Sequence, residues 1–300
     1  MFNPLSKIIY INQKFDEHPI TKNNKIKSWV NYLKYNIVIR VNKGPVEFKW
    51  VNGLKIYVEK GDSCLGGNVF LGLMEFHESA FLVHYLNNSD LFVDVGANLG
   101  HYTLLASGIC RSKTIAIEPI PRTCKKLRYN VKKNNIEQLV TIKNIGVGIE
   151  NGSLNFTDYS NNAINFVQNV PNENSLTLPV QTLNKLLRRE SPNFIKIDVE
   201  GFELFILKGA NKILKNPKLK VVILEINGQC RRYGYIENDV FEYMLKFGYK
   251  PIKYDSFNKK ITLIDKYNHD ADSTIFIKDY KVASHRVKNG SQIQFMNNYS

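Results

Sequence analysis

Acidic residues at the predicted ends of buried strands are the first candidates for chemistry in this sequence. Asp94 follows the apolar run Leu91–Val93, and Glu118 closes the alternating stretch Thr114–Ile117, which Pro119 then ends. Strands of this kind are typical of an open α/β sheet, in which ligands bind in the crevice at the carboxyl ends of the strands. We therefore expect Asp94 and Glu118 to face one common pocket.

The turn that follows Asp94 narrows the choice of ligand. Gly96 and Gly100 lead into a helix expected over His101–Ile109, whose first amide groups would point back at a ligand. A dinucleotide site would need a further glycine between these two, and Asp94 would repel phosphate. S-Adenosylmethionine instead offers an ammonium to Asp94 and a ribose diol to Glu118, which follows Gly96 by roughly 20 residues. The alternative is a sheet in which Asp94 only caps a helix.

Several longer stretches resemble the FkbM family of methyltransferases. They are DVGANLGHYT from Asp94, IEP ending at Pro119, and IKIDVEGFELFILKGA followed by ILEI, within a resemblance that covers about Gly72 to Lys278. The most specific piece is KIDVEG, from Lys196 to Gly201. The resemblance implies a class I methyltransferase fold and transfer of a methyl group from S-adenosylmethionine, usually to a hydroxyl oxygen of a sugar or polyketide.

The resemblance also implies a set of cofactor-binding residues. They are Asp94, Gly96, Asn98 and Gly100 in the first motif, Tyr102 and Thr103 at the helix start, and Glu118 as the ribose-binding acid. The family's upstream aromatic–Glu pair stands here as Met74–Glu75, so the aromatic ring is absent. From the residues alone, Asn144 near the end of a strand expected over Leu139–Val147 could reach adenine with its amide or could form a turn.

Three further side chains are candidates for the chemical step. Asp198 ends a central strand close to where the sulfonium methyl would lie, so its carboxylate is our first choice to position the acceptor or take its proton. His101 is the second choice and Glu200 the third, although an acid in the first turn of a helix is favourable on dipole grounds alone. Glu225 either assists or binds a backbone amide. These acids form no ligand cluster with histidines, so we expect no metal site.

Composition sets broader bounds. Three hundred residues with 43% hydrophobic content can bury a sizeable core, and 41 basic against 27 acidic residues leave a net charge of +14, which favours anionic partners. Much of this charge falls in two predicted helices and is expected on solvated faces. No apolar run approaches the ~20 residues of a membrane span. With no cleavable signal and four cysteines far apart, the sequence predicts a soluble, cytoplasmic protein.

The pattern along the chain predicts an α/β protein with a Rossmann-like, seven-stranded, mostly parallel sheet and an N-terminal cap of a β-hairpin and a helix. The expected parts are a cap over residues 1–85, a methyltransferase domain over 86–280 and a loosely held polar tail over 281–300. Asn52–Gly53 signals the hairpin, and Leu73–Leu86 an amphipathic helix. The last two strands are expected to be antiparallel. The Asn-rich stretch 158–174 is expected to be a lid over the site or a surface insertion.

The leading interpretation is an S-adenosylmethionine-dependent O-methyltransferase that acts on a hydroxyl of a sugar, glycan or other small molecule. The first alternative is an RNA methyltransferase, suggested by the net charge of +14, although no dedicated RNA module is visible. The second is a non-catalytic binding protein with a vestigial cofactor pocket. No sequence feature sets an oligomeric state.

Overall fold

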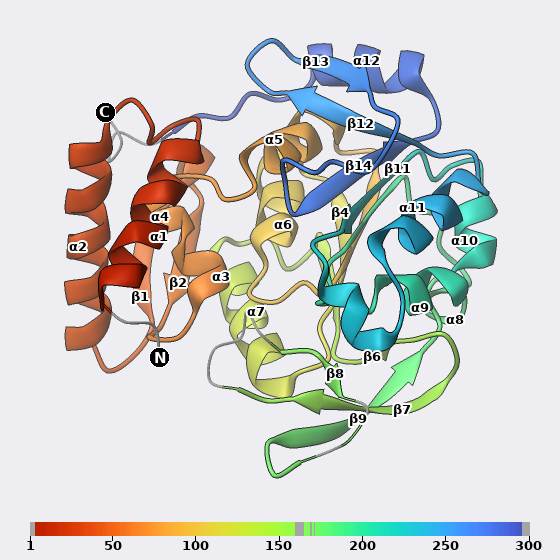
Figure 1. The fold of residues 1–300 in the computed structure, drawn as a ribbon, viewed down its shortest axis with the longest axis horizontal. Coiled ribbons are helices and arrows are strands. Elements are labelled where there is room, and N and C mark those ends of the chain that lie inside the picture. Colours follow the sequence, from red (N-terminus) through yellow and green to blue (C-terminus); the bar gives the residue numbers. More distant parts are fainter. Residues whose placement is uncertain (1–3, 160–164, 169, 171, 296–300) are drawn as a thin grey trace.

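A central sheet organises the chain. The computed structural model describes residues 4–159, 165–168, 170 and 172–295, and within them the central sheet has eight strands in the order β13-β12-β14-β11-β10-β3-β4-β5 (Figure 1). Their bounds are β3 Leu91–Val95, β4 Lys113–Ile117, β5 Val140–Lys143, β10 Phe194–Ile197, β11 Val221–Glu225, β12 Lys250–Asp255, β13 Lys260–Leu263 and β14 Ser273–Ile277. Strands β5, β4, β3, β10 and β11 run parallel to one another. Strand β14 pairs antiparallel with β11, β12 with β14, and β13 with β12. This is the Rossmann-like, mostly parallel sheet that the sequence predicts.

Helices cover both faces of this sheet because its central strands are apolar on both sides. On β3, Phe92 belongs to one hydrophobic cluster and Val93 and Val95 to another on the opposite face. The first face carries α5 Phe76–Tyr85, α6 His101–Leu104 with the π-helical turn Leu105–Ile109, α7 Pro121–Lys133 and α12 Tyr280–Asn289. The second carries α8 Leu183–Leu186, α9 Glu203–Lys208, α10 Asn211–Lys215 and α11 Glu237–Leu245.

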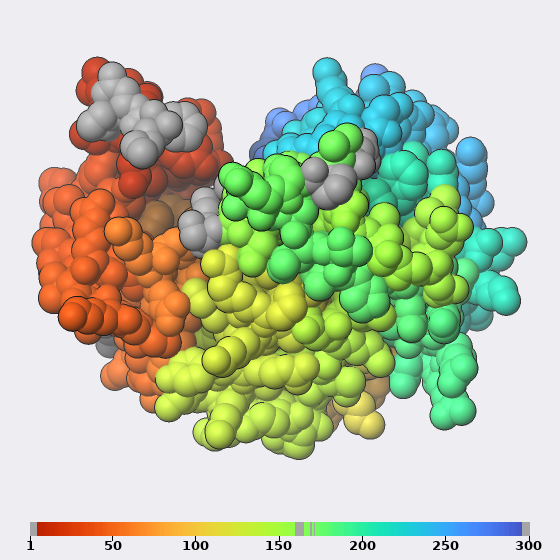
Figure 2. All heavy atoms as spheres, turned by 90° about the horizontal axis from the view of Figure 1, so that it is seen from below, coloured from red at the N-terminus to blue at the C-terminus, as the bar shows by residue number. Residues whose placement is uncertain are grey.

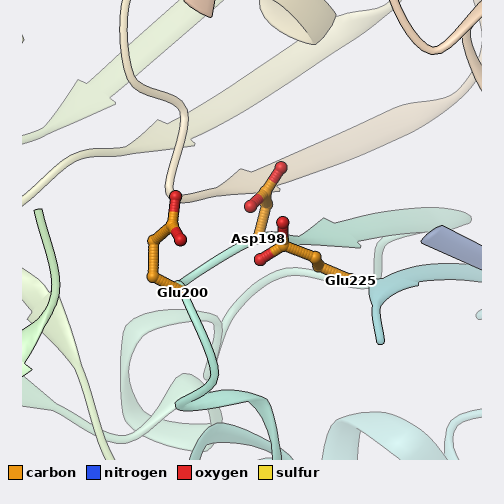
Figure 3. Close-up of side chains that lie close together, drawn as sticks. All are labelled: Asp198, Glu200 and Glu225. Atoms are coloured by element: carbon orange, nitrogen blue, oxygen red, sulfur yellow. The ribbon is translucent and has the colours of Figure 1, made fainter. Parts of the chain in front are cut away.

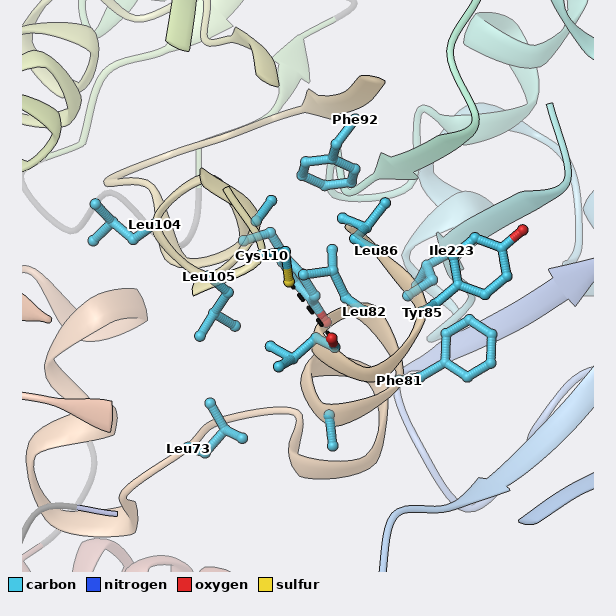
Figure 4. Packing of buried hydrophobic residues seen from close by; sticks show 14 of the residues in the cluster. Leu73, Phe81, Leu82, Tyr85, Leu86, Phe92, Leu104, Leu105, Cys110 and Ile223 are labelled. Carbon is cyan, nitrogen blue, oxygen red and sulfur yellow. Dashed lines mark hydrogen bonds between the residues drawn. The ribbon is translucent and has the colours of Figure 1, made fainter. Parts of the chain in front are cut away.

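Helix α5 lies inside the core rather than on its surface. Phe81, Leu82 and Tyr85 pack toward the sheet and toward Leu104, and the Cys110 thiol donates a hydrogen bond of 3.5 Å to the carbonyl oxygen of Val83 on α5 (Figure 4). Almost every residue of the helix is buried. The expectation of an amphipathic helix over 73–86 was therefore wrong, because both sides of α5 are covered by other elements.

The N-terminal part forms a separate layer at one side of the sheet (Figure 1). It consists of α1 Pro4–Glu17, α2 Lys25–Val41, β1 Val46–Lys49, β2 Lys55–Val58, α3 Ser63–Gly66 and α4 Asn68–Leu71. Strands β1 and β2 pair in antiparallel register across Asn52–Gly53, as the Asn-Gly signal predicts. The indole Nε1 of Trp50 donates to the Gly72 carbonyl 2.7 Å away and ties this hairpin to the segment before α5.

A small second sheet holds part of the predicted lid. Its strands are β6 Gly146–Val147, β7 Gly152–Thr157, β8 Val167–Gln168 and β9 Ser175–Gln181, in the order β6-β9-β7-β8. The single strand expected over Leu139–Val147 is thus two strands, β5 and β6, that join different sheets. Of the stretch 158–174, residues 160–164, 169 and 171 lie outside the described residues, and its closure over the site stays a prediction.

Two expectations about the C-terminal part were wrong. An eighth strand, β13, joins the edge of the sheet; the sequence does not reveal it because Ile261 alone of its residues is buried. The tail over 281–300 begins with α12, in which Val287 is fully buried and Arg286 pairs with Asp90 at 3.0 Å. Beyond it, the Asn52 amide donates to the Gln294 carbonyl at 2.8 Å. The described part of the tail is therefore packed, and the boundary at residue 85 stays a prediction.

No helix in the part of the chain that the structure describes is both long enough and apolar enough to cross a bilayer.

The packing of α12 leads to a test of the role of the C-terminal segment. Val287→Ala removes two methyl groups from a site with no exposure and should lower the free energy of unfolding by about 2 kcal/mol. Val282→Ala on the same helix, where Val282 is 39% exposed, is the matched control and should change it by less than about 0.5 kcal/mol. Urea denaturation measures both. Equal effects of the two substitutions would mean that α12 does not stabilise the fold.

Candidate active site

The glycine turn after β3 is held between the ends of two neighbouring strands. The amides of Gly96 and Ala97 donate to the Ile117 carbonyl of β4 at 3.0 and 3.1 Å. On the other side, a Cβ atom at Gly96 would overlap the carbonyl oxygen of Asp198, and Gly96 has a φ of +79°. Only glycine meets both requirements, because the close approach leaves no space for a side chain and the backbone is left-handed. The turn thereby brings the ends of β3, β4 and β10 together.

Glu118 lies at the end of β4, where its carboxylate is held by the backbone. Its Oε2 accepts a hydrogen bond from the Asn98 amide at 3.0 Å, and its Oε1 accepts one from the Ile120 amide at 2.9 Å. Burial raises the pKa of Glu118 to about 7 against the lowering effect of these two amides, and nearby Asp94 raises it further. Each oxygen keeps acceptor capacity beyond its one amide. The side chain can therefore accept two hydroxyl groups of a ligand.

Asp94 is beside Glu118 on the next strand but does not line the cavity that runs along these strand ends. Its carboxylate accepts a hydrogen bond from the Thr103 hydroxyl at 2.6 Å, and burial raises its pKa to about 6. The expectation that Asp94 and Glu118 face one pocket is therefore corrected: Asp94 lies beneath the turn. Thr103 and Tyr102, predicted to bind the cofactor, do not line the cavity either: the Thr103 hydroxyl is bound to Asp94, and the Tyr102 hydroxyl donates to Glu75 at 2.7 Å.

Lys196 begins the motif KIDVEG and, among the described residues, carries the most buried charge at this end of the sheet. Its Nζ lies 3.2 Å from Asp198, 3.5 Å from Glu75 and 2.9 Å from the Ser273 hydroxyl, to which it donates. Burial alone would lower the pKa of Lys196, but Asp198 and Glu75 outweigh it and raise the pKa well above its usual value. The spacing of Lys196 and Asp198, two residues apart in a strand, was the available signal because it places both on one face.

Asp198, Glu200 and Glu225 converge at the ends of β10 and β11 (Figure 3). One carboxylate oxygen of each lies within 4.8 Å of the others. Burial, with Asp198 and Glu203 beside it, raises the pKa of Glu200 to about 8, and burial also raises that of Glu225. Carboxylates this close cannot all ionise without a proton or a cation between them. The sequence did not predict this cluster, which contains no histidine and is built of the oxygen donors that Mg²⁺ or Ca²⁺ prefers.

The helix-capping alternative for Glu200 is also corrected. Helix α9 begins at Glu203, and it is Glu203 whose Oε1 accepts the amides of Val199 and Gly201 at 3.1 and 3.3 Å. Glu200 instead has a φ of +55° and lines the cavity. Its side chain is therefore available to a ligand rather than committed to the helix.

His101, the second choice for a base, lies away from the cavity. Its Nε2 is 2.7 Å from the Ser79 hydroxyl, which itself donates to the Met74 carbonyl at 2.8 Å, so Nε2–H is the donor to Ser79. Its Nδ1 then accepts from the Asn68 amide at 3.1 Å. The ring packs against Trp50, and burial lowers the pKa of His101 to about 4. The prediction that His101 acts as a base is therefore contradicted, because both ring nitrogens serve to join α4, α5 and α6.

Asn144 and Gly100 also differ from their predicted roles. The amide of Asn144 donates to the carbonyl oxygens of Glu118 and Pro119, at 2.8 Å each, and Asn144 does not line the cavity. The structure therefore does not support the adenine contact, and Asn144 does not form the alternative turn either: it lies between β5 and β6, and its side chain joins them to the segment after β4. Gly100, with a φ of +101°, caps α6 without lining the cavity. Its left-handed backbone lets the chain turn into α6 at this position.

A cavity of about 980 Å³ runs along the carboxyl ends of β3, β4, β10 and β11, where the strand order reverses. Gly96, Asn98, Glu118, Asp198 and Glu200 all line it. Its volume is at the upper end of the range for ligand pockets and leaves room for two substrates. The space-filling view shows a recess between the red and orange N-terminal layer and the green and blue parts of the chain (Figure 2).

The charge of this cavity is opposite to that of the chain. Of the described residues that line it, Lys14 is the one lysine or arginine, beside three histidines. The acidic residues of the lining are Glu17, Glu75, Glu78, Glu118, Asp198, Glu200, Glu225, Glu237, Asp270 and Asp272. Although the net charge of +14 predicts anionic partners, the cavity favours cationic or uncharged ligands.

A relative of known function matches part of the chain. The chain is 30% identical over 149 residues to the hexuronic acid methyltransferase AglP of Haloferax volcanii, an alignment that takes in 49% of this chain and 59% of that protein. The chain thus spans about three fifths of the curated relative that it matches.

Two solved structures show weak likeness. Precorrin-6y C5,15-methyltransferase from Geobacter metallireducens has a TM-score of 0.37 and 14% identity, over 67% of this chain and 84% of that one. An rRNA methylase from Streptococcus thermophilus has a TM-score of 0.39 and 13% identity, over 66% of this chain and 91% of that one.

A model of the methyltransferase FkbM domain matches residues 94–251, which is more than half of the chain and includes the glycine turn, Glu118, the acidic cluster and the strands between them. The chain therefore belongs to the FkbM methyltransferase family.

Proposed function

We propose that this protein is an S-adenosylmethionine-dependent O-methyltransferase whose acceptor is a hydroxyl group of a sugar or glycan. The observation that carries the proposal is the backbone-held carboxylate of Glu118 beside the glycine turn, in the same cavity as Asp198. The first group suits a ribose diol and the second suits the acceptor hydroxyl. Family membership supports an enzyme over a non-catalytic binding protein.

The residues present fit this cofactor. Glu118 would accept both ribose hydroxyls, and the apolar side chains of Ile117, Pro119 and Ile145 line the adjoining part of the cavity, where the adenine would pack. The acidic lining suits a ligand that carries a sulfonium and an ammonium group. When bound, S-adenosylmethionine supplies an electrophilic methyl group on positively charged sulfur.

Asp198 is proposed to act on the acceptor. Its side chain is 31% exposed to the cavity, and Lys196 at 3.2 Å holds one carboxylate oxygen in place. The other oxygen would accept the proton of the sugar hydroxyl as the hydroxyl oxygen takes the methyl group. Alignment of the two reactants would supply most of the acceleration, since proximity and orientation are worth ~7–11 kcal/mol. Glu200 and Glu225 would then bind neighbouring hydroxyls.

The acidic lining favours a sugar over RNA as the acceptor. A polynucleotide would bring phosphate groups against an acidic cavity, and the basic side chains that produce the net charge lie elsewhere. The name of the relative AglP supports a sugar. A hexuronic acid would fit with its carboxylate toward the Lys14 side of the cavity rather than toward Asp198.

Part of the predicted lid borders the same cavity. Phe166 and Val167 line it, and the guanidinium of Arg232 lies 3.7 Å from the centre of the Phe166 ring. We propose that the described part of this stretch, with Phe166 and Val167, covers the acceptor when both substrates are bound, which would exclude water from the reacting atoms.

Incubation with isotope-labelled S-adenosylmethionine tests the proposed function. Acceptors would be matched hexose and hexuronic acid glycosides, extracted glycans and, as the competing class, total RNA. Label on a sugar hydroxyl, located by mass spectrometry, is the expected result. Label on RNA, or the absence of label on every sugar together with no cofactor binding, would contradict the proposal.

The raised pKa of Glu118 predicts a pH dependence of cofactor binding. Its carboxylate ionises around pH 7, and the ionised form accepts both ribose hydroxyls, so affinity for S-adenosylmethionine should rise about tenfold between pH 6 and pH 8. Glu118→Gln should bind more weakly at both values and lose this dependence. Glu137→Gln, at an exposed position, is the control. Titration calorimetry measures the affinities. If Glu118→Gln retains the pH dependence of cofactor affinity, Glu118 does not bind the ribose in the proposed way.

Replacing the proposed base should separate binding from turnover. Asp198→Asn keeps the shape of the side chain but cannot take a proton, so kcat should fall by about a hundredfold or more. Its dissociation constant for S-adenosylmethionine should stay within about twofold, whereas Asp94→Ala should lose cofactor binding because the turn loses its support from Thr103. Asp265→Asn, exposed and outside the cavity, is the control. Full activity of Asp198→Asn would exclude it as the base.

We further propose that turnover needs no metal ion, because the ammonium of Lys196 already sits 3.2 Å from Asp198 and would repel a divalent cation. Dialysis against EDTA should therefore leave kcat/KM unchanged. If EDTA abolishes activity and added Mg²⁺ or Mn²⁺ restores it, the cluster of Asp198, Glu200 and Glu225 is a metal site instead.

A further inference from the structure

Helix α2 has an apolar stripe that no other element covers within the part of the chain that the structure describes. Its members are strongly exposed: Ile26 by 82%, Val30 by 42%, Leu33 by 55%, Ile37 by 61% and Val41 by 75%. The spacing of three or four residues places all five along one line of the helix. Single exposed apolar residues are ordinary on a protein surface, but a continuous line over the whole length of a helix is not.

The stripe lies on the side of α2 that faces away from the protein. Ser28 and Ile39 are buried, and Tyr32 packs against Phe15 of α1 and Phe70 of α4. At about 100° per residue, these positions lie on the opposite side of the helix from the stripe. Helix α2 also forms the outer edge of the molecule (Figure 1). The sequence pattern therefore encodes two apolar faces, one for the protein and one for a partner.

Basic side chains border the stripe. Lys34 is on one side of it and Arg40 on the other, both exposed, and Lys43 follows the helix end. Helix α2 contains no acidic residue. An exposed apolar line between basic side chains is the arrangement of helices that lie in the interface of a membrane, where the apolar residues enter the acyl boundary and the cations meet anionic headgroups.

We propose that α2 docks on an anionic lipid bilayer. A second copy of this chain is the competing occupant, since the three-and-four spacing would also suit a seam between two helices. Charge decides between them: a paired α2 would bring Lys34 and Arg40 near the same cations of its partner, with no acid on either helix to compensate. An anionic surface is complementary to both features of the helix.

Docking would hold the protein at a surface where lipid-carried sugars are found. This consequence rests on the proposed function, but the docking itself does not. Helix α1 packs against α2 and contributes Tyr10 and Lys14 to the cavity wall, so one layer would serve both the membrane and the site.

Co-sedimentation with lipid vesicles tests the proposal on the full chain. The probes are phosphatidylcholine vesicles with and without phosphatidylglycerol. The wild-type protein should sediment with the anionic vesicles, and its binding should weaken as salt is raised. Leu33→Gln with Ile37→Gln should weaken binding by at least about tenfold, and so should Lys34→Glu with Arg40→Glu.

Matched variants separate docking from general surface effects. Ile236→Gln with Leu263→Gln removes exposed apolar side chains elsewhere, and Lys212→Glu with Lys215→Glu makes the same charge change on α10; both should bind as the wild type does. Circular dichroism confirms folding of each variant. The proposal is overturned if the wild type ignores anionic vesicles, or if the α2 variants bind as well as their controls. It is also overturned if light scattering shows a dimer that Leu33→Gln with Ile37→Gln converts to monomer, because a second copy then covers the stripe.

Discussion

The buried ammonium group of Lys196 is the constraint around which the end of the sheet is arranged. A charge removed from water needs opposite charges and hydrogen-bond acceptors around it, because its desolvation is otherwise prohibitive. Asp198 just after β10, Glu75 before α5 and Ser273 on β14 supply them. These three residues are far apart in the sequence, so the contacts of one lysine join the segment before α5, the centre of the sheet and its antiparallel part. The same contacts hold Asp198 at the cavity.

The glycine turn adds a second, steric constraint at the same place. Gly96 allows the β3 loop to approach the backbone of Asp198, while the Asn98 amide donates to Glu118 on the other side. The distance between the cofactor end and the acceptor end of the cavity therefore depends on backbone contacts rather than on mobile side chains. Rigid placement of this kind is what an in-line transfer between two substrates requires.

Net charge turned out to be a poor guide to the site. The chain carries +14, yet its cavity is lined mainly by carboxyl groups, some of which have their pKa raised by burial and by one another. A field summed over the whole molecule governs long-range attraction, whereas a ligand in a cavity experiences the groups within a few ångströms. The basic surface and the acidic cavity can thus serve different partners, a membrane surface and a sugar in our proposals.

The sequence by itself determined the elements and their ends: the parallel strands, the hairpin at Asn52–Gly53, the glycine turn, and the positions of Glu118 and Asp198 at strand ends. Those features are local, since apolar periodicity, turn residues and strand polarity act within a few residues. Tertiary structure alone decided which side chains meet. It placed His101 between Ser79 and Asn68 instead of at the cavity, brought Glu225 to Glu200, and left one face of α2 uncovered. Periodicity tells which face of an element is apolar, but the partner of that face is chosen by packing between segments distant in the chain.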